Sequence, residues 1–128
     1  DSYGPLVIKS RAVILATGRF ISGGLEARMD NILEPLVGIP VVQPESRDQW
    51  YRQKYLDKMG HDIHRAGIEV DDCYRPLGPD GEPMFENLFA AGIIIAHQDW
   101  IRQRCGAGIA LSTAYKAVES AARFLSRQ

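Results

Sequence analysis

The pattern of hydrophobic positions along the chain predicts a small parallel sheet and one long helix. Nearly unbroken aliphatic runs that end on glycine occur at residues 12–18 and 87–92. A strand buried on both faces of a parallel sheet is aliphatic along its length, so we expect both runs to be central strands. From Ala107 to about Arg127, apolar residues recur at helical spacing, and they are Ile109, Ala110, Ala114, Ala117, Val118, Ala121, Ala122 and Leu125. Because much of this stripe is alanine, the helix axis can approach a sheet closely.

The patterns between these elements are weaker. Further strands are expected at residues 6–9, 37–42 and 68–74, whereas residues 18–35 are expected to form a loop. Residues 78–83 read Gly-Pro-Asp-Gly-Glu-Pro. This is a turn sequence, because proline fixes φ and glycine permits a positive φ.

A helix is expected from Arg47 to Met59. Ser46 is a suitable N-cap, and Gly60 is a suitable stop signal. The helix would have an aromatic side, formed by Trp50, Tyr51, Tyr55 and Leu56.

Composition narrows the class of protein without selecting a function. Of the 128 residues, 45% are apolar and 24% are charged, which is typical of a globular protein. The net charge of −1 argues against nucleic acid as a partner. No apolar run approaches the roughly 20 residues that cross a bilayer. Two cysteines are too few for a disulfide framework, so a reducing, cytoplasmic environment is expected.

The glycine-rich corners are the candidate ligand site. One is Ala16-Thr17-Gly18, another is Gly92 with Ile93, and the third is Cys105-Gly106-Ala107-Gly108-Ile109 at the start of the long helix. The first turn of a helix has unpaired N–H groups and attracts negative charge, as on a reduced flavin. We expect the backbone around Thr17, Gly92 and Gly106 to line a common crevice. Because no Gly-x-Gly-x-x-Gly turn occurs, the chain is interpreted as the second half of a nucleotide-binding domain.

Other candidates for chemistry are weaker. His97 lies in the loop before the glycine-rich helix and is a possible acid or base, and Arg75 is a possible anion-binding group. His61 and His64 have a spacing compatible with a metal on a helix, but they lack a clear third ligand. We therefore expect no metal site.

The order of these motifs resembles that in flavoproteins of the succinate dehydrogenase and fumarate reductase type. More narrowly, the chain resembles the C-terminal part of the B subunits of anaerobic glycerol-3-phosphate dehydrogenases. The matching stretches run in family order across nearly the whole chain, and they are residues 16–25, 34–38, 47–51, 75–76, 87–92 and 105–108.

The resemblance implies an α/β fold, namely the C-terminal portion of a Rossmann-like FAD/NAD(P)-binding domain with an inserted cap segment. Residues 1–35 would be the strand-rich end of that domain, residues 36–86 the cap-like insertion, and residues 87–128 the returning strand and flavin-facing helix. The three glycine-rich corners would bind the flavin, which is FAD or FMN.

The resemblance also implies a biochemical role. The complex would oxidise sn-glycerol 3-phosphate to dihydroxyacetone phosphate and pass electrons to quinone. Its other members would be a second flavoprotein subunit and a membrane-associated iron–sulfur subunit. The protein would be cytoplasmic and held at the inner membrane through that partner.

Alternatives to this role stay open. Flavoproteins of the wider class often place an acidic residue after Ala-Ala-Gly, but here Ile93 follows Gly92, so backbone groups would have to substitute. The chain could therefore belong to another flavin oxidoreductase, or to an assembly or electron-relay subunit that has lost its flavin. Without the other half of the site, the segment alone is expected to be inactive. Exposed sheet edges would favour its self-association.

Overall fold

Two short parallel strands form the centre of the structure, a computed structural model that describes residues 4–127. Strand β1 (Val13–Leu15) pairs with β6 (Leu88–Ala90), with Val13 opposite Leu88. The two predicted aliphatic strands are confirmed, although both are shorter than their hydrophobic runs. The expectation that the first is buried on both faces is wrong, because Val13 is 46% exposed and Ile14 is 37% exposed.

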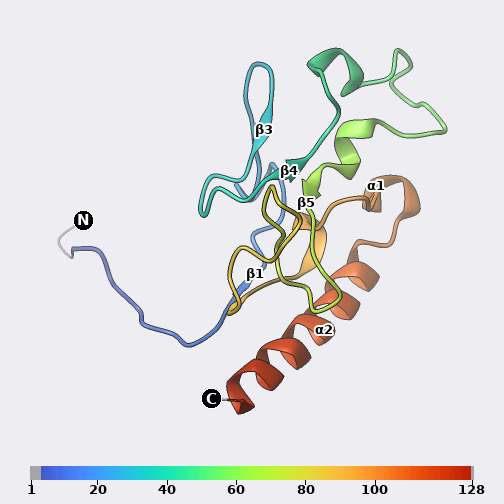
Figure 1. Cartoon of the computed structure of the whole chain (residues 1–128). Coiled ribbons are helices and arrows are strands. Elements are labelled where there is room, and N and C mark those ends of the chain that lie inside the picture. The colour runs from blue at the N-terminus through green and yellow to red at the C-terminus, as the bar shows by residue number, and fades with distance from the viewer. Residues whose placement is uncertain (1–3, 128) are drawn as a thin grey trace.

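Helix α2 (Gly106–Ser126) packs across this strand pair and confirms the predicted C-terminal helix (Figure 1). The buried side of the helix differs from the predicted stripe, because Val118 is 55% exposed and Ala110 and Ala122 are exposed. The buried residues of the helix are Thr113, Ala117, Ser120 and Ala121. A hydroxyl can lie on the buried side of the helix because it donates a hydrogen bond within the helix. Thr113 Oγ1 donates to the carbonyl of Ile109, 2.6 Å away.

Short turns connect β6 to α2. Gly92–Ile94 form the 3-10 helix η3, and Trp100–Gln103 form the short helix α1. Asp99 caps α1 by accepting a hydrogen bond from the backbone N–H of Arg102 at 3.1 Å.

Two small antiparallel strand pairs extend the structure beyond the central strands. Strand β2 (Glu26–Ala27) pairs with β3 (Ile32–Leu33), so the predicted loop at residues 18–35 contains a hairpin. Strand β4 (Val41–Val42) pairs with β5 (Gly67–Ile68). The strands predicted at 37–42 and 68–74 are thus much shorter than expected.

The turn between β3 and β4 is built around a buried carboxylate. Glu34 is 2% exposed, and its side chain accepts hydrogen bonds from four successive backbone N–H groups at 2.8 to 3.2 Å. Those groups belong to Leu36, Val37, Gly38 and Ile39. Charge-assisted bonds of this kind replace the regular strand that the hydrophobic pattern predicted here.

The predicted helix at residues 47–59 is wrong. Only the 3-10 helix η1 (Arg47–Gln49) forms, and Ser46 makes no side-chain cap bond. Instead of helical hydrogen bonds, backbone groups of this segment contact the ring of His61. Its Nδ1 accepts a hydrogen bond from the N–H of Arg52 at 3.0 Å, and its Nε2 lies 2.9 Å from the carbonyl oxygen of Tyr55. His61 immediately precedes the 3-10 helix η2 (Asp62–Arg65). Of the predicted aromatic side, only Trp50 is buried; Tyr51, Tyr55 and Leu56 are exposed.

Two further predictions concern the N-terminal segment and the turn before β6. No strand forms at residues 6–9, where Leu6, Val7 and Ile8 are at least 78% exposed and the chain extends away from the body of the molecule (Figure 1). The turn at 78–83 is confirmed, since the N–H of Gly78 donates to the carbonyl of Glu82 at 2.8 Å.

The division into segments 1–35, 36–86 and 87–128 stays a prediction, and residues 1–3 and 128 lie outside the described part. A helix of the length and hydrophobicity needed to span a bilayer does not occur within residues 4–127.

Candidate functional site

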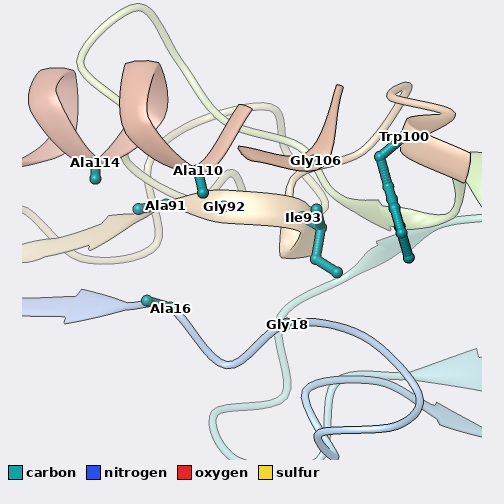
Figure 2. A pocket seen from close by; sticks show the side chains of 9 residues that line it. All are labelled: Ala16, Gly18, Ala91, Gly92, Ile93, Trp100, Gly106, Ala110 and Ala114. Atoms are coloured by element: carbon teal, nitrogen blue, oxygen red, sulfur yellow. The ribbon is translucent and has the colours of Figure 1, made fainter. Parts of the chain in front are cut away.

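A pocket of about 460 Å³ lies where the carboxyl ends of β1 and β6 meet the first turns of α2. Figure 2 shows Ala110 and Ala114 on the helix above Ala91 and Gly92, with Ala16 and Gly18 below them and Trp100 to one side. Ile93 and Gly106 complete its lining. Parallel pairing brings the two strand ends to the same edge, and that edge is where open α/β sheets bind their ligands.

The structure brings the three glycine-rich corners together at this pocket, as the sequence predicted. Five of the candidate residues line it, and they are Ala16, Gly18, Gly92, Ile93 and Gly106. Thr17 lies between two lining residues, and Cys105 immediately precedes the helix. The lining does not include Ala107, Gly108 or Ile109, which continue the first turn of α2. Whether any of these residues binds a cofactor stays a prediction.

The helix start offers backbone donors to the pocket. The first bond inside α2 runs from the N–H of Ile109 to the carbonyl of Cys105 at 2.9 Å, and the Cys105 side chain makes no cap bond. The N–H groups of residues 106–108 therefore have no partner within the helix, and they carry its partial positive charge.

One glycine lines the pocket, and a second supports the loop after β1. Gly92 has φ +81°, and a Cβ on it would meet nothing within 4 Å, so its backbone faces open space. Gly24 fits closely under the loop after β1, because a Cβ there would come within 2.1 Å of the Gly18 carbonyl oxygen. The Thr17 hydroxyl oxygen in the same loop is buried and has no partner among residues 4–127. An unpartnered buried hydroxyl beside an open pocket fits a polar group of a ligand.

Arg19 holds the loop after β1 against the segment after β6. This residue is 4% exposed, and its guanidinium donates to the carbonyls of Ile93, His64, Ile95 and Gln98. The bonds to Ile95 and Gln98 measure 3.1 and 3.0 Å. Burial lowers the pKa of Arg19 to about 10, and the nearby Asp99 carboxylate opposes that shift.

Sequence reasoning missed Arg19 as a site residue. The available signal was an arginine directly after a buried strand and its glycine, in a loop expected to face the ligand. A planar guanidinium with five donors is suited to cross-linking several carbonyls there.

The other candidates lie away from the pocket lining. His97 has φ 72°, and its Nε2 lies 2.6 Å from a carboxylate oxygen of Glu69. Arg75 pairs with Asp71 at 2.7 Å. Neither lines the pocket, so the structure does not bring them to the glycine-rich corners. Residues 4–127 contain no cluster of three or more His, Cys, Asp or Glu side chains that would hold a metal ion.

The lining of the pocket is chemically compatible with a flavin. Its described lining residues are apolar or glycine, with one indole, and none has a titratable side chain. Such walls suit a flat aromatic ring system, while the helix N–H groups suit the negative charge that a reduced flavin carries. The volume is also within the range of roughly 300–1,000 Å³ that is usual for ligand pockets.

Comparison with known proteins assigns the class. A family model described as FAD binding domain matches residues 4–109, which include the strand ends and the start of α2. The chain belongs to the FAD binding domain family, with an α/β fold, and FAD is the cofactor of that family.

Three similar relatives are B subunits of anaerobic glycerol-3-phosphate dehydrogenase. The one from Vibrio vulnificus strain CMCP6 is 33% identical over 118 residues, covering 92% of this chain and 26% of that protein. The one from Aliivibrio fischeri strain MJ11 is 29% identical, over 93% of this chain and 26% of that protein. The one from Yersinia pestis bv. Antiqua strain Antiqua is 30% identical, over 92% and 27%.

These similarities confirm the resemblance found in the motifs. The chain spans about a quarter of the length of the curated relatives it matches. No solved structure matches the chain.

Proposed function

We propose that this chain forms the flavin-facing part of an FAD-dependent dehydrogenase subunit. Its complex would oxidise sn-glycerol 3-phosphate to dihydroxyacetone phosphate and pass the electrons toward quinone. The observation that supports this proposal is the meeting of two strand ends and a helix N-terminus at one pocket, within a segment of the FAD binding domain family. In this proposal, the chain is the C-terminal portion of a Rossmann-like domain, with a cap-like segment inserted between β1 and β6.

The residues of this chain would hold the cofactor mainly through the backbone. The N–H groups of Gly106 and its two successors would face the ring edge where negative charge develops, and the Thr17 hydroxyl would take one further polar group. Ile93 and Trp100 would pack against the ring and exclude water. Bound FAD would supply the two-electron acceptor that alcohol oxidation needs.

The proposed assembly and location draw on the names of the relatives. Each name designates one subunit of a dehydrogenase, which implies partner subunits. We propose that the protein works with a second flavoprotein subunit and a membrane-associated iron–sulfur subunit, on the cytoplasmic side of the inner membrane.

A second candidate function is electron relay without substrate oxidation. The observation in its favour is the lack of a titratable side chain among the described residues that line the flavin pocket. Oxidation of an alcohol releases a proton, and a pocket without an acid or base cannot accept it.

Flavin content tests the cofactor site. Ala110 lines the pocket and is exposed, so Ala110→Leu fills the pocket without straining the helix. Ala122→Leu is the matched control, because Ala122 is an exposed alanine on the same helix and does not line the pocket. We expect the full-length protein to lose flavin roughly tenfold or more in the first variant, which corresponds to about 1.4 kcal/mol of binding free energy. Equal flavin content in both variants would contradict the site.

Reduction by substrate separates the two functions. The flavin of the purified subunit should bleach when it is mixed anaerobically with glycerol 3-phosphate. Bleaching that occurs only in the presence of the second flavoprotein subunit would support electron relay instead.

A further inference from the structure

A second pocket adjoins the flavin pocket and shares two of its walls. This pocket encloses about 360 Å³, and Ile93 and Trp100 line both cavities. Its other lining residues come from the loop after β1, from β2 and from the segment around η2, and they include Arg19, Ser22, Ala27, Tyr51 and His64. A molecule bound here would therefore contact two of the residues that also line the first pocket.

Among the chain's 3 histidines, only His64 combines a place in this pocket with free ring nitrogens. Within residues 4–127, no hydrogen bond joins the His64 ring to another residue. In contrast, both ring nitrogens of His61 lie within hydrogen-bonding distance of backbone groups, at 3.0 and 2.9 Å. His97 is paired with Glu69 and lies in neither pocket. His64 is therefore the histidine that can exchange a proton with a bound molecule.

The polar groups of the lining favour an anionic, hydroxylated ligand. Arg19 supplies a positive charge, and the described lining residues include no carboxylate, although the buried Asp99 carboxylate lies near Arg19 behind the lining. Four of the five guanidinium donors are matched to the four bonds to backbone carbonyls, which leaves one N–H on Nη1. The hydroxyls of Ser22 and Tyr51 add further hydrogen-bonding groups. Ser22 Oγ donates to the Thr17 carbonyl at 2.6 Å and so keeps its acceptor lone pairs.

We infer that this second pocket is a substrate pocket for a small hydroxy compound that carries an anionic group, with His64 as the acceptor of the hydroxyl proton. This inference rests on the proposed function, because it places the substrate beside the flavin pocket. It supplies the titratable group that the flavin pocket itself lacks.

The proposed reaction balances with the groups named. Bound FAD would supply the two-electron acceptor for the hydrogen and electron pair that leave the substrate carbon. The substrate hydroxyl loses its proton to a ring nitrogen of His64, and the product is a ketone. Burial lowers the pKa of His64; the Asp99 carboxylate opposes this shift, and the neighbouring His61 and Arg19 add to it. The ring is therefore neutral near pH 7 and able to accept a proton.

Ligand binding can be measured without turnover. Trp100 lines both pockets, so its fluorescence should change when glycerol 3-phosphate titrates the flavin-free, full-length protein. Ala27→Phe fills the second pocket from an exposed position that does not line the first. We expect this variant to weaken glycerol 3-phosphate binding at least about tenfold and to retain its flavin content. Unchanged binding in the variant, or no binding to the unaltered protein, would overturn the substrate pocket.

The role of His64 needs a separate variant. His64→Gln should keep the affinity for glycerol 3-phosphate within about threefold and slow flavin reduction about a hundredfold, the usual contribution of a general base. His97→Gln is the matched control, and its flavin should be reduced at the normal rate. Normal reduction in His64→Gln would overturn the proton-acceptor role. Failure of the proposed function is distinguishable, because the purified protein would then contain no flavin, whatever its affinity for glycerol 3-phosphate.

Discussion

The backbone N–H of Gly92 donates a hydrogen bond of 2.7 Å to the hydroxyl oxygen of Thr113. This bond fixes the distance between the segment after β6 and helix α2, and both line the pocket at the carboxyl ends of the strands. The same hydroxyl donates to the Ile109 carbonyl at 2.6 Å, so it bridges two partly buried backbone groups. A polar residue on the buried side of the helix thus sets the pocket's width.

Removal of the Thr113 hydroxyl should destabilise the fold and loosen the pocket. Thr113→Val keeps the shape of the side chain but leaves the Gly92 N–H without an acceptor. We expect the free energy of unfolding to fall by about 1 kcal/mol, the usual net contribution of one hydrogen bond. Chemical denaturation measures this loss. Thr113→Ser retains the hydroxyl and should lose less stability, and an equal loss in both variants would argue against the hydrogen bond as the cause.

Replacement of Arg19 by lysine should destabilise the fold far more than the shared positive charge of the two residues would indicate. A single ammonium cannot reach four carbonyls that a planar guanidinium joins, so several buried acceptors lose their partners. We expect Arg19→Lys to lower the free energy of unfolding by on the order of 3 kcal/mol. Arg28→Lys is the control, because Arg28 forms an exposed pair with Glu26 at 3.0 Å and should change stability by less than about 0.5 kcal/mol. Similar losses in the two variants would contradict the anchoring role of Arg19.

Glu34 should stabilise the turn between β3 and β4 through its charge. Glu34→Gln keeps the size of the side chain but replaces one acceptor oxygen with a donor that faces backbone N–H groups. We expect a loss of about 2 kcal/mol in unfolding free energy, as for charge-assisted bonds to buried donors. Glu45→Gln, at an exposed position, should unfold like the unaltered protein. The expectation fails if Glu34→Gln unfolds at the same denaturant concentration as this control.

The pH dependence of flavin reduction should follow His64. Its pKa is lowered from 6.5 mainly by burial, so the ring stays neutral in the folded protein at a pH where the unfolded chain begins to bind a proton. Stability from this group is full above the unfolded pKa and falls as the pH drops toward the folded pKa. The reduction rate should be flat above pH 6.5, the ordinary pKa of histidine, and fall only as the pH drops toward the lowered pKa of His64, as measured by rapid mixing. A slow but pH-independent rate is expected for His64→Gln, and an unaltered profile in that variant would contradict the assignment.

The central strands and the long helix were predictable because their signals are local. Residues 87–92 and 107–127 contain enough of their own hydrophobic pattern to specify a strand and a helix. The meeting of the glycine-rich corners was also predictable, since parallel strands end at the same edge of a sheet. The buried side of α2 was not, because Thr113 and Ser120 count as polar in any hydrophobic pattern.

The segment around residues 47–59 could not be predicted in this way. Its amphipathic pattern favours a helix, but the ring of His61 bonds backbone groups of Arg52 and Tyr55 and holds an irregular path. The role of Arg19 was hidden for a similar reason. Its four acceptors belong to residues 64–98, and local sequence gives no measure of such distant contacts.

The register of β1 against β6 also has an evolutionary meaning. Because Leu15 pairs with Ala90, residues 16–89 form one long loop whose two ends lie side by side. The entropic cost of closing such a loop rises only slowly with its length. Related genes can therefore gain or lose stretches within this loop while the two strand ends keep their positions.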